Sequence, residues 1–266
     1  MRPRLKEHSD LIIKDFIRQK IDESGASGVV IGLSGGVDSA VVSKLCADSI
    51  GPEKVLNVFM PSRASTREDH KDAEKFSRKF GMEFKVVSIV PVVEAYQSIL
   101  PSPERKETLG NVMTRSRMIV LFHQAKLMNR IVMGTSNKSE LLMGYFTKFG
   151  DGGADFYPIG DLYKTEVKEL AKKIGIPENL IEKVPTAGLW VGQTDEGEMG
   201  ISYENLDVIL MGIELGLTSE EIVSKTGLDP KLVDLVWNKH RTSVHKRKMP
   251  LAPKIGIRTL GLDWRE

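Results

Sequence analysis

Apolar residues in the first half of the chain alternate between short continuous runs and patterns with helical spacing. The runs are too short for helices and rich in β-branched residues, so they predict buried strands. They lie at residues 29–33, 55–60, 84–89 and 130–133. Because helical patterns separate them, the sequence predicts an α/β fold, in which helices cover both faces of a parallel sheet and the crossovers are right-handed.

Apolar side chains with helical spacing define the predicted helices, and glycines follow several of them. The sets are Leu11, Ile12, Phe16 and Ile17; Val42, Leu45 and Cys46; Ala73, Phe76 and Phe80; and Met118, Leu121, Phe122, Ala125 and Met128. Alternation of strands and helices at this spacing predicts a Rossmann-like, doubly wound sheet.

The chain changes character beyond residue 144. Residues 144–155 are rich in Gly and Asp, which predicts a mobile surface loop. The segment 187–200 is acidic and punctuated by glycines, so it predicts a second loop. A helix is expected from Lys164 to Gly175, and two or three more within residues 202–245. We therefore expect a helical C-terminal region.

The composition fits one soluble globular unit, because 41% of the 266 residues are hydrophobic and 28% are charged, so we expect a single domain over residues 1–266. Acidic and basic residues are interleaved and the net charge is +2, so neither nucleic acid nor a membrane is an expected partner. No signal-peptide pattern and no window of about 18 apolar residues occurs, which favours the cytoplasm. The one cysteine, Cys46, excludes a disulfide framework, and both Cys46 and His123 are expected to be packed.

The strongest chemical signal lies between the first predicted strand and the next helix. The segment is Gly32-Leu33-Ser34-Gly35-Gly36-Val37-Asp38-Ser39. Its glycines allow a tight turn that points backbone N–H groups at an anion, and the following helix adds its positive end. It is neither a Walker A loop, with the pattern G-x-x-x-x-G-K-[ST], nor a G-x-G-x-x-G dinucleotide-binding loop. Asp38 would repel phosphates unless a divalent cation lay between them, so we expect Mg²⁺ with a polyphosphate here; the alternative is an ordinary glycine turn capped by Asp38.

The segment Ser34-Gly35-Gly36-Val37-Asp38-Ser39 resembles the signature of the ATP pyrophosphatase superfamily, whose members cleave ATP between the α and β phosphates. Further blocks resemble ammonia-dependent NAD synthetase, in the same order and along nearly the whole chain. They lie at residues 111–118, 134–140, 144–155, 164, 183–187, 195–196 and 245–247. Several blocks in order are more specific than any single block, so the resemblance points to this family.

The resemblance implies roles for particular residues. Asp38 and Glu140 would bind Mg²⁺, and Asp38 and Lys164 would be the catalytic residues. ATP, as a co-substrate, would be bound by Gly32 to Ser39 together with Thr135, Lys164 and Thr186. Deamido-NAD would be bound by Arg115, Lys148, Asp155, His245 and Lys246. The sequence departs from the family pattern at Val37, where many relatives carry glutamine, and at Ser136, where many carry aspartate.

Each of these residues also has a purely structural interpretation. Glu140 could cap a surface helix, and Lys164 could be the first turn of an amphipathic helix. Lys148 and Asp155 fall in a predicted loop, where solvated side chains are the ordinary expectation. The pair at residues 245–246 could belong to a solvated helix end.

The resemblance also implies a reaction. The nicotinate carboxylate of deamido-NAD would attack the α-phosphorus of ATP, and ammonia would then displace AMP from the acyl-adenylate. The protein would supply positioning and charge neutralisation, with the loop at 144–155 as a lid. The chain has no length for a glutaminase domain and its lone cysteine is placed for packing, so free ammonia is the expected donor. A homodimer is implied too, with residues 90–128 and 202–245 as possible interfaces.

Two other functions remain open. A different synthetase of the same superfamily would act on another nucleotide carboxylate or carbonyl, and the acceptor that supports release of AMP would identify it. A non-catalytic module would only bind ATP, although binding alone scarcely needs a pair of metal-ligating acids.

Overall fold

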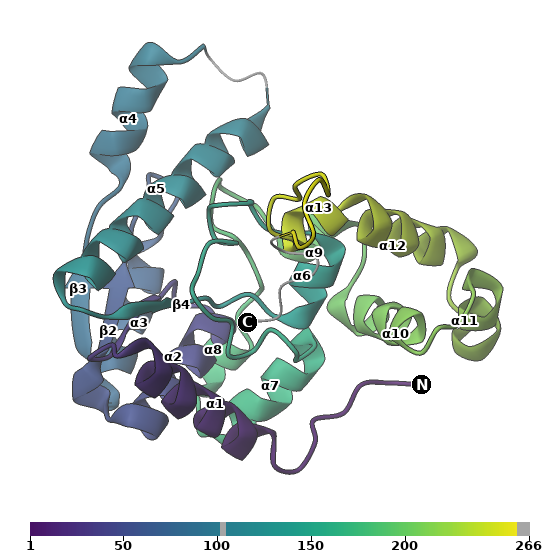
Figure 1. The fold of residues 1–266 in the computed structure, drawn as a ribbon, viewed down its shortest axis with the longest axis horizontal. Coiled ribbons are helices and arrows are strands. Elements are labelled where there is room, and N and C mark those ends of the chain that lie inside the picture. The colour runs from purple at the N-terminus through teal and green to yellow at the C-terminus, as the bar shows by residue number, and fades with distance from the viewer. Residues whose placement is uncertain (102–104, 260–266) are drawn as a thin grey trace.

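A four-stranded parallel sheet lies at the centre of the molecule (Figure 1). The computed structural model describes residues 1–101 and 105–259. The strands are β1 (Val29–Gly32), β2 (Val55–Phe59), β3 (Glu83–Val86) and β4 (Ile131–Met133), in the order β3-β2-β1-β4. The order switches direction between β1 and β4, and such a switch point leaves a crevice at the carboxyl ends of the strands.

Helices cover both faces of this sheet, so its inner strands are buried on each side. Val29 and Ile31 of β1 pack into one apolar core, whereas Val30 between them packs into another. The first core is formed with α1 (Ser9–Ser24), α2 (Val37–Ile50), α3 (Arg67–Lys79), α7 (Lys164–Lys173) and α8 (Glu178–Ile181), and the second with α4 (Val90–Ile99) and α5 (Lys106–Leu127). A 3-10 turn, Pro52–Lys54, leads into β2. The predicted α/β fold with a parallel sheet is confirmed.

The C-terminal region is helical, as predicted, and lies to one side of the sheet (Figure 1). Its own apolar core includes Tyr203, Ile209 and Val236. The helices beyond β4 that belong to this region or border it are α6 (Lys138–Met143), α9 (Asp195–Met199), α10 (Tyr203–Glu214), α11 (Ser219–Thr226), α12 (Pro230–Thr242) and α13 (Val244–Arg247). None of the helices described for residues 1–101 and 105–259 combines the length and the apolar character that crossing a membrane requires.

Three local predictions were wrong. The third strand ends at Val86 rather than at residue 89, because Ile89 already caps the start of α4. The predicted loop at 187–200 contains α9, whose start is capped by the Thr194 hydroxyl accepting from the Gly197 N–H. His123 is exposed rather than packed. Cys46, in contrast, is fully buried as predicted.

The first predicted helix is confirmed as α1, but its buried face differs from the apolar set read from the sequence. Leu11 and Ile12 are 54% and 65% exposed, whereas Ile13, Ile17 and Ile21 face the core. The single domain predicted for residues 1–266 stays a prediction, and its residues 102–104 and 260–266 lie outside the described part of the chain.

Candidate active site

The glycine segment after β1 folds into a tight loop held by its own hydroxyl groups. Gly35 has a φ of +82°, and a Cβ there would lie 2.9 Å from the carbonyl oxygen of Asp69, so only glycine fits. The N–H groups of Ser34 and Gly36 donate to the hydroxyls of Ser39 and Ser34. The Ser39 hydroxyl donates to the Gly36 carbonyl oxygen at 3.0 Å. The loop leads into α2, whose first N–H groups lack helical partners and suit an anion.

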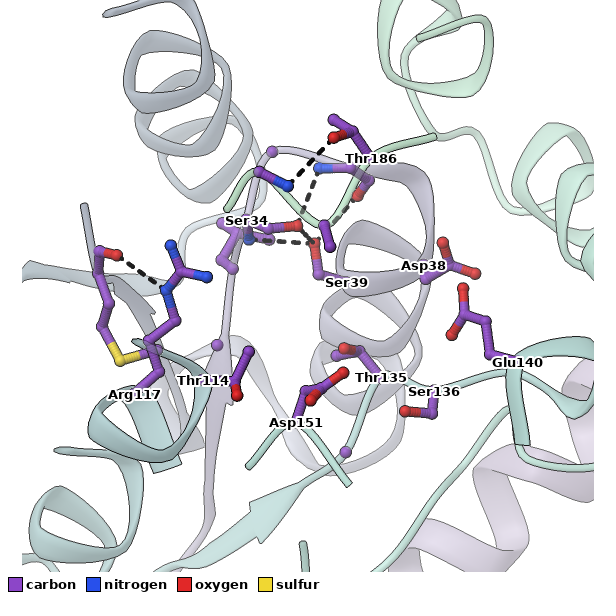
Figure 2. Close-up of a pocket in the computed structure, with 18 of the residues that line it drawn as sticks. Ser34, Asp38, Ser39, Thr114, Arg117, Thr135, Ser136, Glu140, Asp151 and Thr186 are labelled. Atoms are coloured by element: carbon purple, nitrogen blue, oxygen red, sulfur yellow. Dashed lines mark hydrogen bonds between the residues drawn. The ribbon is translucent and has the colours of Figure 1, made fainter. Parts of the chain in front are cut away.

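This loop forms one wall of a pocket that is partly open to solvent and has a volume of about 270 Å³ (Figure 2). Thr135 follows β4, and Thr186 comes from the segment after α8 that faces the loop. The residues predicted to bind ATP or metal that line this pocket are 32–39, Thr135, Glu140, Lys164 and Thr186. Pockets for single drug-sized ligands measure roughly 300–1,000 Å³. The volume of this pocket lies just below that range, and the pocket is partly open to solvent.

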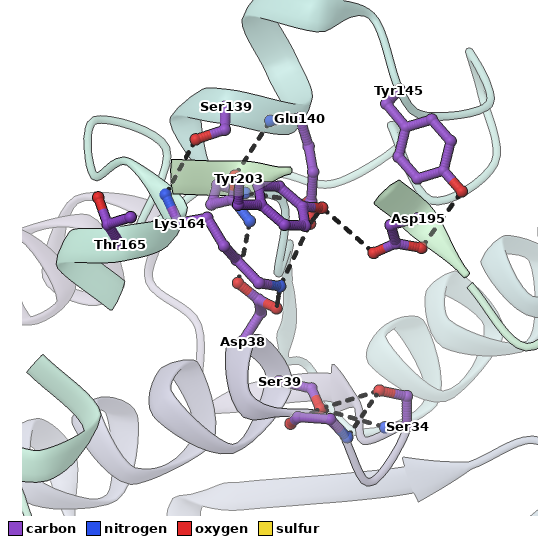
Figure 3. Close-up of polar contacts among 12 residues, drawn as sticks. Ser34, Asp38, Ser39, Ser139, Glu140, Tyr145, Lys164, Thr165, Asp195 and Tyr203 are labelled. Atoms are coloured by element: carbon purple, nitrogen blue, oxygen red, sulfur yellow. Dashed lines mark hydrogen bonds and ion pairs between the residues drawn. The ribbon is translucent and has the colours of Figure 1, made fainter. Parts of the chain in front are cut away.

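A buried lysine joins the two acids predicted to bind metal (Figure 3). Lys164 is only 2% exposed; its ammonium forms a very short ion pair with Asp38 and lies 3.7 Å from Glu140 Oε1. Asn137 donates from its side chain to Asp38 at 3.0 Å. Asp38 lies in the first turn of α2 and Glu140 in the first turn of α6. The ends of β1 and β4 thus bring both acids to one edge of the sheet.

A third acid, Asp195 of α9, completes this group, and we call Asp38, Glu140, Lys164 and Asp195 the charge centre (Figure 3). Asp195 is 5% exposed, and one of its oxygens accepts from the hydroxyl of Tyr203 at 3.2 Å. The Tyr203 hydroxyl also lies 3.4 Å from Glu140 Oε1. The charge centre therefore combines three acidic side chains with one ammonium, and two of these acids lie within ion-pair distance of it.

Burial and mutual repulsion govern protonation in the charge centre. Burial raises the pKa of Glu140 to about 8, and repulsion from Asp38 adds to this rise. Burial likewise raises the pKa of Asp195. Burial disfavours the ammonium of Lys164, but attraction to Asp38 and Glu140 outweighs it, and the pKa of Lys164 is raised. The raised pKa values of Glu140, Asp195 and Lys164 are typical of a site with excess negative charge. An added cation would reduce this excess.

The charge centre fits Mg²⁺ together with a polyphosphate. Mg²⁺ binds oxygen ligands, commonly one or two carboxylates plus substrate phosphates and water. Across residues 1–101 and 105–259, no three His, Cys, Asp or Glu side chains are arranged to hold a metal by themselves. Asp38 and Glu140 can therefore supply part of a coordination shell that phosphate oxygens would complete.

Four of the five residues predicted to bind deamido-NAD gather on a rim outside the pocket lining. Arg115 and His245 are exposed, and Lys148 is half-buried. The Arg115 guanidinium donates to the Lys148 carbonyl oxygen at 3.3 Å, and the Lys148 ammonium donates to the His245 carbonyl oxygen at 2.9 Å. Lys246 donates to the carbonyl oxygens of residues 144 and 146. Binding of deamido-NAD by this rim stays a prediction.

The fifth residue, Asp155, lies at the end of the predicted loop at 144–155 and is engaged elsewhere. Its carboxylate accepts from the Val132 N–H at 2.7 Å, beside β4. The loop contains turns but no helix or strand, as predicted, and the Thr147 N–H donates to the Asp151 carboxylate at 2.8 Å. Its mobility and the role of Asp155 in binding stay predictions.

The structural interpretations of Glu140 and Lys164 hold alongside their place in the pocket. Glu140 closes a capping box with Asn137 at the start of α6, and Lys164 is the first residue of α7. Val37 packs into the apolar core, and Ser136 is buried at the pocket. Helix capping alone does not explain why acids converge on one buried ammonium.

Several pocket residues received no role from the sequence. They are Asp69, Arg117, Asp151, Lys183 and Asp195. Lys183 forms an ion pair with Asp69 at 2.7 Å, which ties the segment after α8 to α3 beside the glycine loop. Lys183 and Asp195 lie in blocks that carried the family resemblance, which was the signal available. Tyr203 gave no signal, because its position resembles that of any packed helical residue.

A glycine loop and paired acids at the switch point of a parallel sheet define an α/β enzyme of the nucleotide-binding type. The chain belongs to the NAD synthase family, whose model matches residues 11–250. A relative from Pyrococcus horikoshii named NH(3)-dependent NAD(+) synthetase is 48% identical over 242 residues, covering 91% of this chain and 92% of that one. Another of the same name, from Thermococcus kodakarensis, is 46% identical over 243 residues, covering 91% and 95%.

Solved structures agree with this membership. An NH3-dependent NAD synthetase from Campylobacter jejuni superposes with a TM-score of 0.79 at 34% identity, covering 93% of this chain and 98% of that one. An NMN synthetase from Francisella tularensis gives 0.83 at 36% identity, covering 94% and 98%. A glutamine-dependent NAD+ synthetase from Acinetobacter baumannii gives 0.69 at 28% identity, covering all of this chain but 50% of that one. The predicted family and its ammonia-dependent synthetase class are confirmed.

The raised pKa of Glu140 predicts how stability depends on pH without Mg²⁺. Folding raises this pKa from 4.5 to about 8, so the folded protein binds an extra proton between these values. The free energy of unfolding should therefore fall as pH rises through this window, by about 2–4 kcal/mol. Glu140→Gln should remove most of the fall in urea titrations with a chelator. The exposed Glu178→Gln is the control, and an unchanged pH dependence in both variants would contradict this assignment.

Proposed function

We propose that this chain amidates the nicotinate carboxylate of deamido-NAD with ammonia, using ATP, and releases NAD, AMP and pyrophosphate. One observation carries the proposal: a buried charge centre with excess acid lies beside a glycine loop at the helix end where a polyphosphate would bind. The relatives named NH(3)-dependent NAD(+) synthetase support the choice of acceptor and nitrogen donor.

In the first step a carboxylate oxygen of deamido-NAD forms a bond to the α-phosphorus, and the bond from that phosphorus to the β-phosphate bridging oxygen breaks. The glycine loop, with the first N–H groups of α2, binds the departing pyrophosphate. Lys164 neutralises charge that develops on the phosphoryl oxygens. Mg²⁺ held by Asp38 and Glu140 would neutralise phosphate charge and so make pyrophosphate a better leaving group.

In the second step the ammonia nitrogen attacks the carbonyl carbon of the acyl-adenylate, the bond to AMP breaks, and a proton leaves the nitrogen. The reacting ends of the two substrates must meet at this pocket for the transfer. The rim of Arg115, Lys148, His245 and Lys246 would bind the dinucleotide, placing its carboxylate near the α-phosphate. The loop at 144–155 is suited to keep water from the adenylate.

Ammonia rather than glutamine is the nitrogen donor in this proposal. A glutaminase reaction of the cysteine type needs an accessible thiolate. Cys46 is the one cysteine of the chain; it is fully buried, and burial strongly raises the pKa of its thiol. It therefore cannot act as that nucleophile.

We also propose that the chain acts as a homodimer through α4 and α5. These helices project from the sheet (Figure 1) and expose an apolar surface. Its members are Val92, Tyr96, Ile99, Leu100 and Ile119. Contiguous apolar surface of this kind marks association sites. Sedimentation equilibrium should give twice the chain mass, and Ile99→Asp should shift it toward the monomer; a monomeric wild type would contradict the proposal.

Loss of the Asp38 carboxylate should abolish the reaction with little effect on the fold. We expect Asp38→Asn to lower kcat by about 100-fold or more, because it removes a metal-binding oxygen and the partner of Lys164. The assay couples NAD formation from deamido-NAD, ATP, Mg²⁺ and ammonium to a dehydrogenase. Asp48→Asn on the same helix, which removes the charge that pairs with Lys44, is the matched control. Full activity of Asp38→Asn would refute the metal role.

The similarity to an NMN synthetase favours a second candidate, in which the acceptor is the carboxylate precursor of NMN. That acceptor lacks the adenylate half of deamido-NAD, so it would use less of the exposed rim. We expect kcat/KM to be at least about tenfold higher for deamido-NAD, and Lys148→Ala to narrow this gap. Parallel measurements of AMP release with both acceptors decide the question, and a higher kcat/KM for the mononucleotide would favour the second candidate.

A further inference from the structure

A carboxylate outside the pocket links the two helices that carry Glu140 and Lys164. Asp207 of α10 is completely buried. Ser139, which precedes Glu140, donates its hydroxyl to Asp207 Oδ1 in a very short hydrogen bond. Thr165, which follows Lys164, donates its N–H and its hydroxyl to Asp207 Oδ2 at 2.9 and 2.8 Å. Asp207 therefore binds the residues that directly adjoin Glu140 and Lys164 in the chain.

Ser139 completes a bridge between α6 and α7. Its hydroxyl oxygen accepts from the Lys164 N–H at 2.9 Å while its proton goes to Asp207. The first N–H groups of a helix have no partner within the helix. At the start of α7 the N–H groups of Lys164 and Thr165 are instead bound by side chains of α6 and α10. This fixes the register of α7 against α6 at the charge centre (Figure 3).

The same face of α10 also reaches the charge centre directly. Tyr203 lies four residues before Asp207, one helical turn away. Its hydroxyl contacts Asp195 and Glu140, and the Lys164 ammonium lies 5.0 Å from the centre of its ring. One turn of α10 thus contacts the charge centre through Tyr203. Through Asp207 it contacts Ser139 and Thr165, the chain neighbours of Glu140 and Lys164.

A buried carboxylate is a costly way to stabilise a helix contact, because well-packed apolar residues often do as well. Three hydrogen bonds and the positive end of α7 offset part of this cost, although burial still raises the pKa of Asp207. These bonds are directional, so they set positions more narrowly than apolar packing would. That property matters where two side chains must meet a substrate at fixed places.

We propose that Asp207 is a positioning residue of the ATP site: by binding Ser139 and Thr165 it sets the placement of Glu140 relative to Lys164, without touching substrate. The inference rests on the proposed function, since it takes Glu140 and Lys164 to hold the metal-bound nucleotide. Residues that orient metal ligands commonly change affinity by about 10- to 100-fold when they are lost.

Calorimetric binding of Mg²⁺ with α,β-methylene-ATP, which cannot be cleaved between the α and β phosphorus, tests this role apart from turnover. Asp207→Ala should weaken binding about tenfold or more and lower kcat/KM for ATP to a similar degree. Asp207→Asn should remain within about threefold of wild type, because its amide can accept from Thr165 and donate to the Ser139 hydroxyl. This rescue by a near-isosteric side chain separates positioning from a need for the charge itself.

Glu221→Gln is the matched control, because its carboxylate accepts from the Thr218 N–H at 2.8 Å in the same helical region, at the start of α11. It should leave nucleotide affinity unchanged.

If Asp207→Ala does not fold, Ser139→Ala removes one link and should weaken binding about three- to tenfold. A folded Asp207→Ala or Ser139→Ala protein with wild-type affinity overturns the proposal. A failure of the proposed function would give a different result. In that case Glu140→Gln would also leave the Mg²⁺ dependence of nucleotide binding unchanged.

Discussion

The ammonium of Lys164 joins Asp38 and Glu140 in the charge centre, and the hydroxyl of Tyr203 links Asp195 to them. Each acid lies in the first turn of its helix, Asp38 in α2, Glu140 in α6 and Asp195 in α9, where the positive helix end favours negative charge. That field disfavours a cation, so Lys164 is retained by the acids themselves. Because three acidic side chains share one ammonium, burial and mutual repulsion raise the pKa values of Glu140 and Asp195.

Sheet topology explains why these helix ends meet. The chain crosses from β1 to β2 and β3 on one side and returns to β4 on the other, so the segments after β1 and β4 diverge and leave a crevice between them. The glycine loop fills one side of this crevice, and residues 134–140 fill the other. Gly35 lets the loop turn closely against the backbone of Asp69 at the edge of the crevice. The proposed phosphate and metal sites therefore lie at one edge of the sheet and come from the ends of two separate strands.

Much of the fold and part of the site could be predicted from the sequence, because strands, helices and the glycine loop depend on local sequence patterns. Asp38 was found by its place in the loop, and Glu140 and Lys164 by resemblance to a family. The contacts of Asp195 and Tyr203 could not be predicted, since they depend on how α9 and α10 pack against α6, far away in sequence. Asp195 even fell in a predicted loop. Local periodicity says which face of a helix is apolar but not which distant polar group it will meet.

The helical C-terminal region therefore contributes directly to the charge centre, because Tyr203 of α10 contacts Glu140 and Asp195. Its apolar core includes Met143 at the end of α6 and Tyr203 at the start of α10. Packing of this core sets the distance between α10 and α6, and the hydrogen bonds of Asp207 and Tyr203 convert that distance into side-chain positions at the pocket. A shift of α10 would move Glu140 and Asp195 relative to Lys164, and Coulombic energies at such short range change steeply with distance. The geometry that binds the nucleotide thus depends on apolar packing as much as on charge.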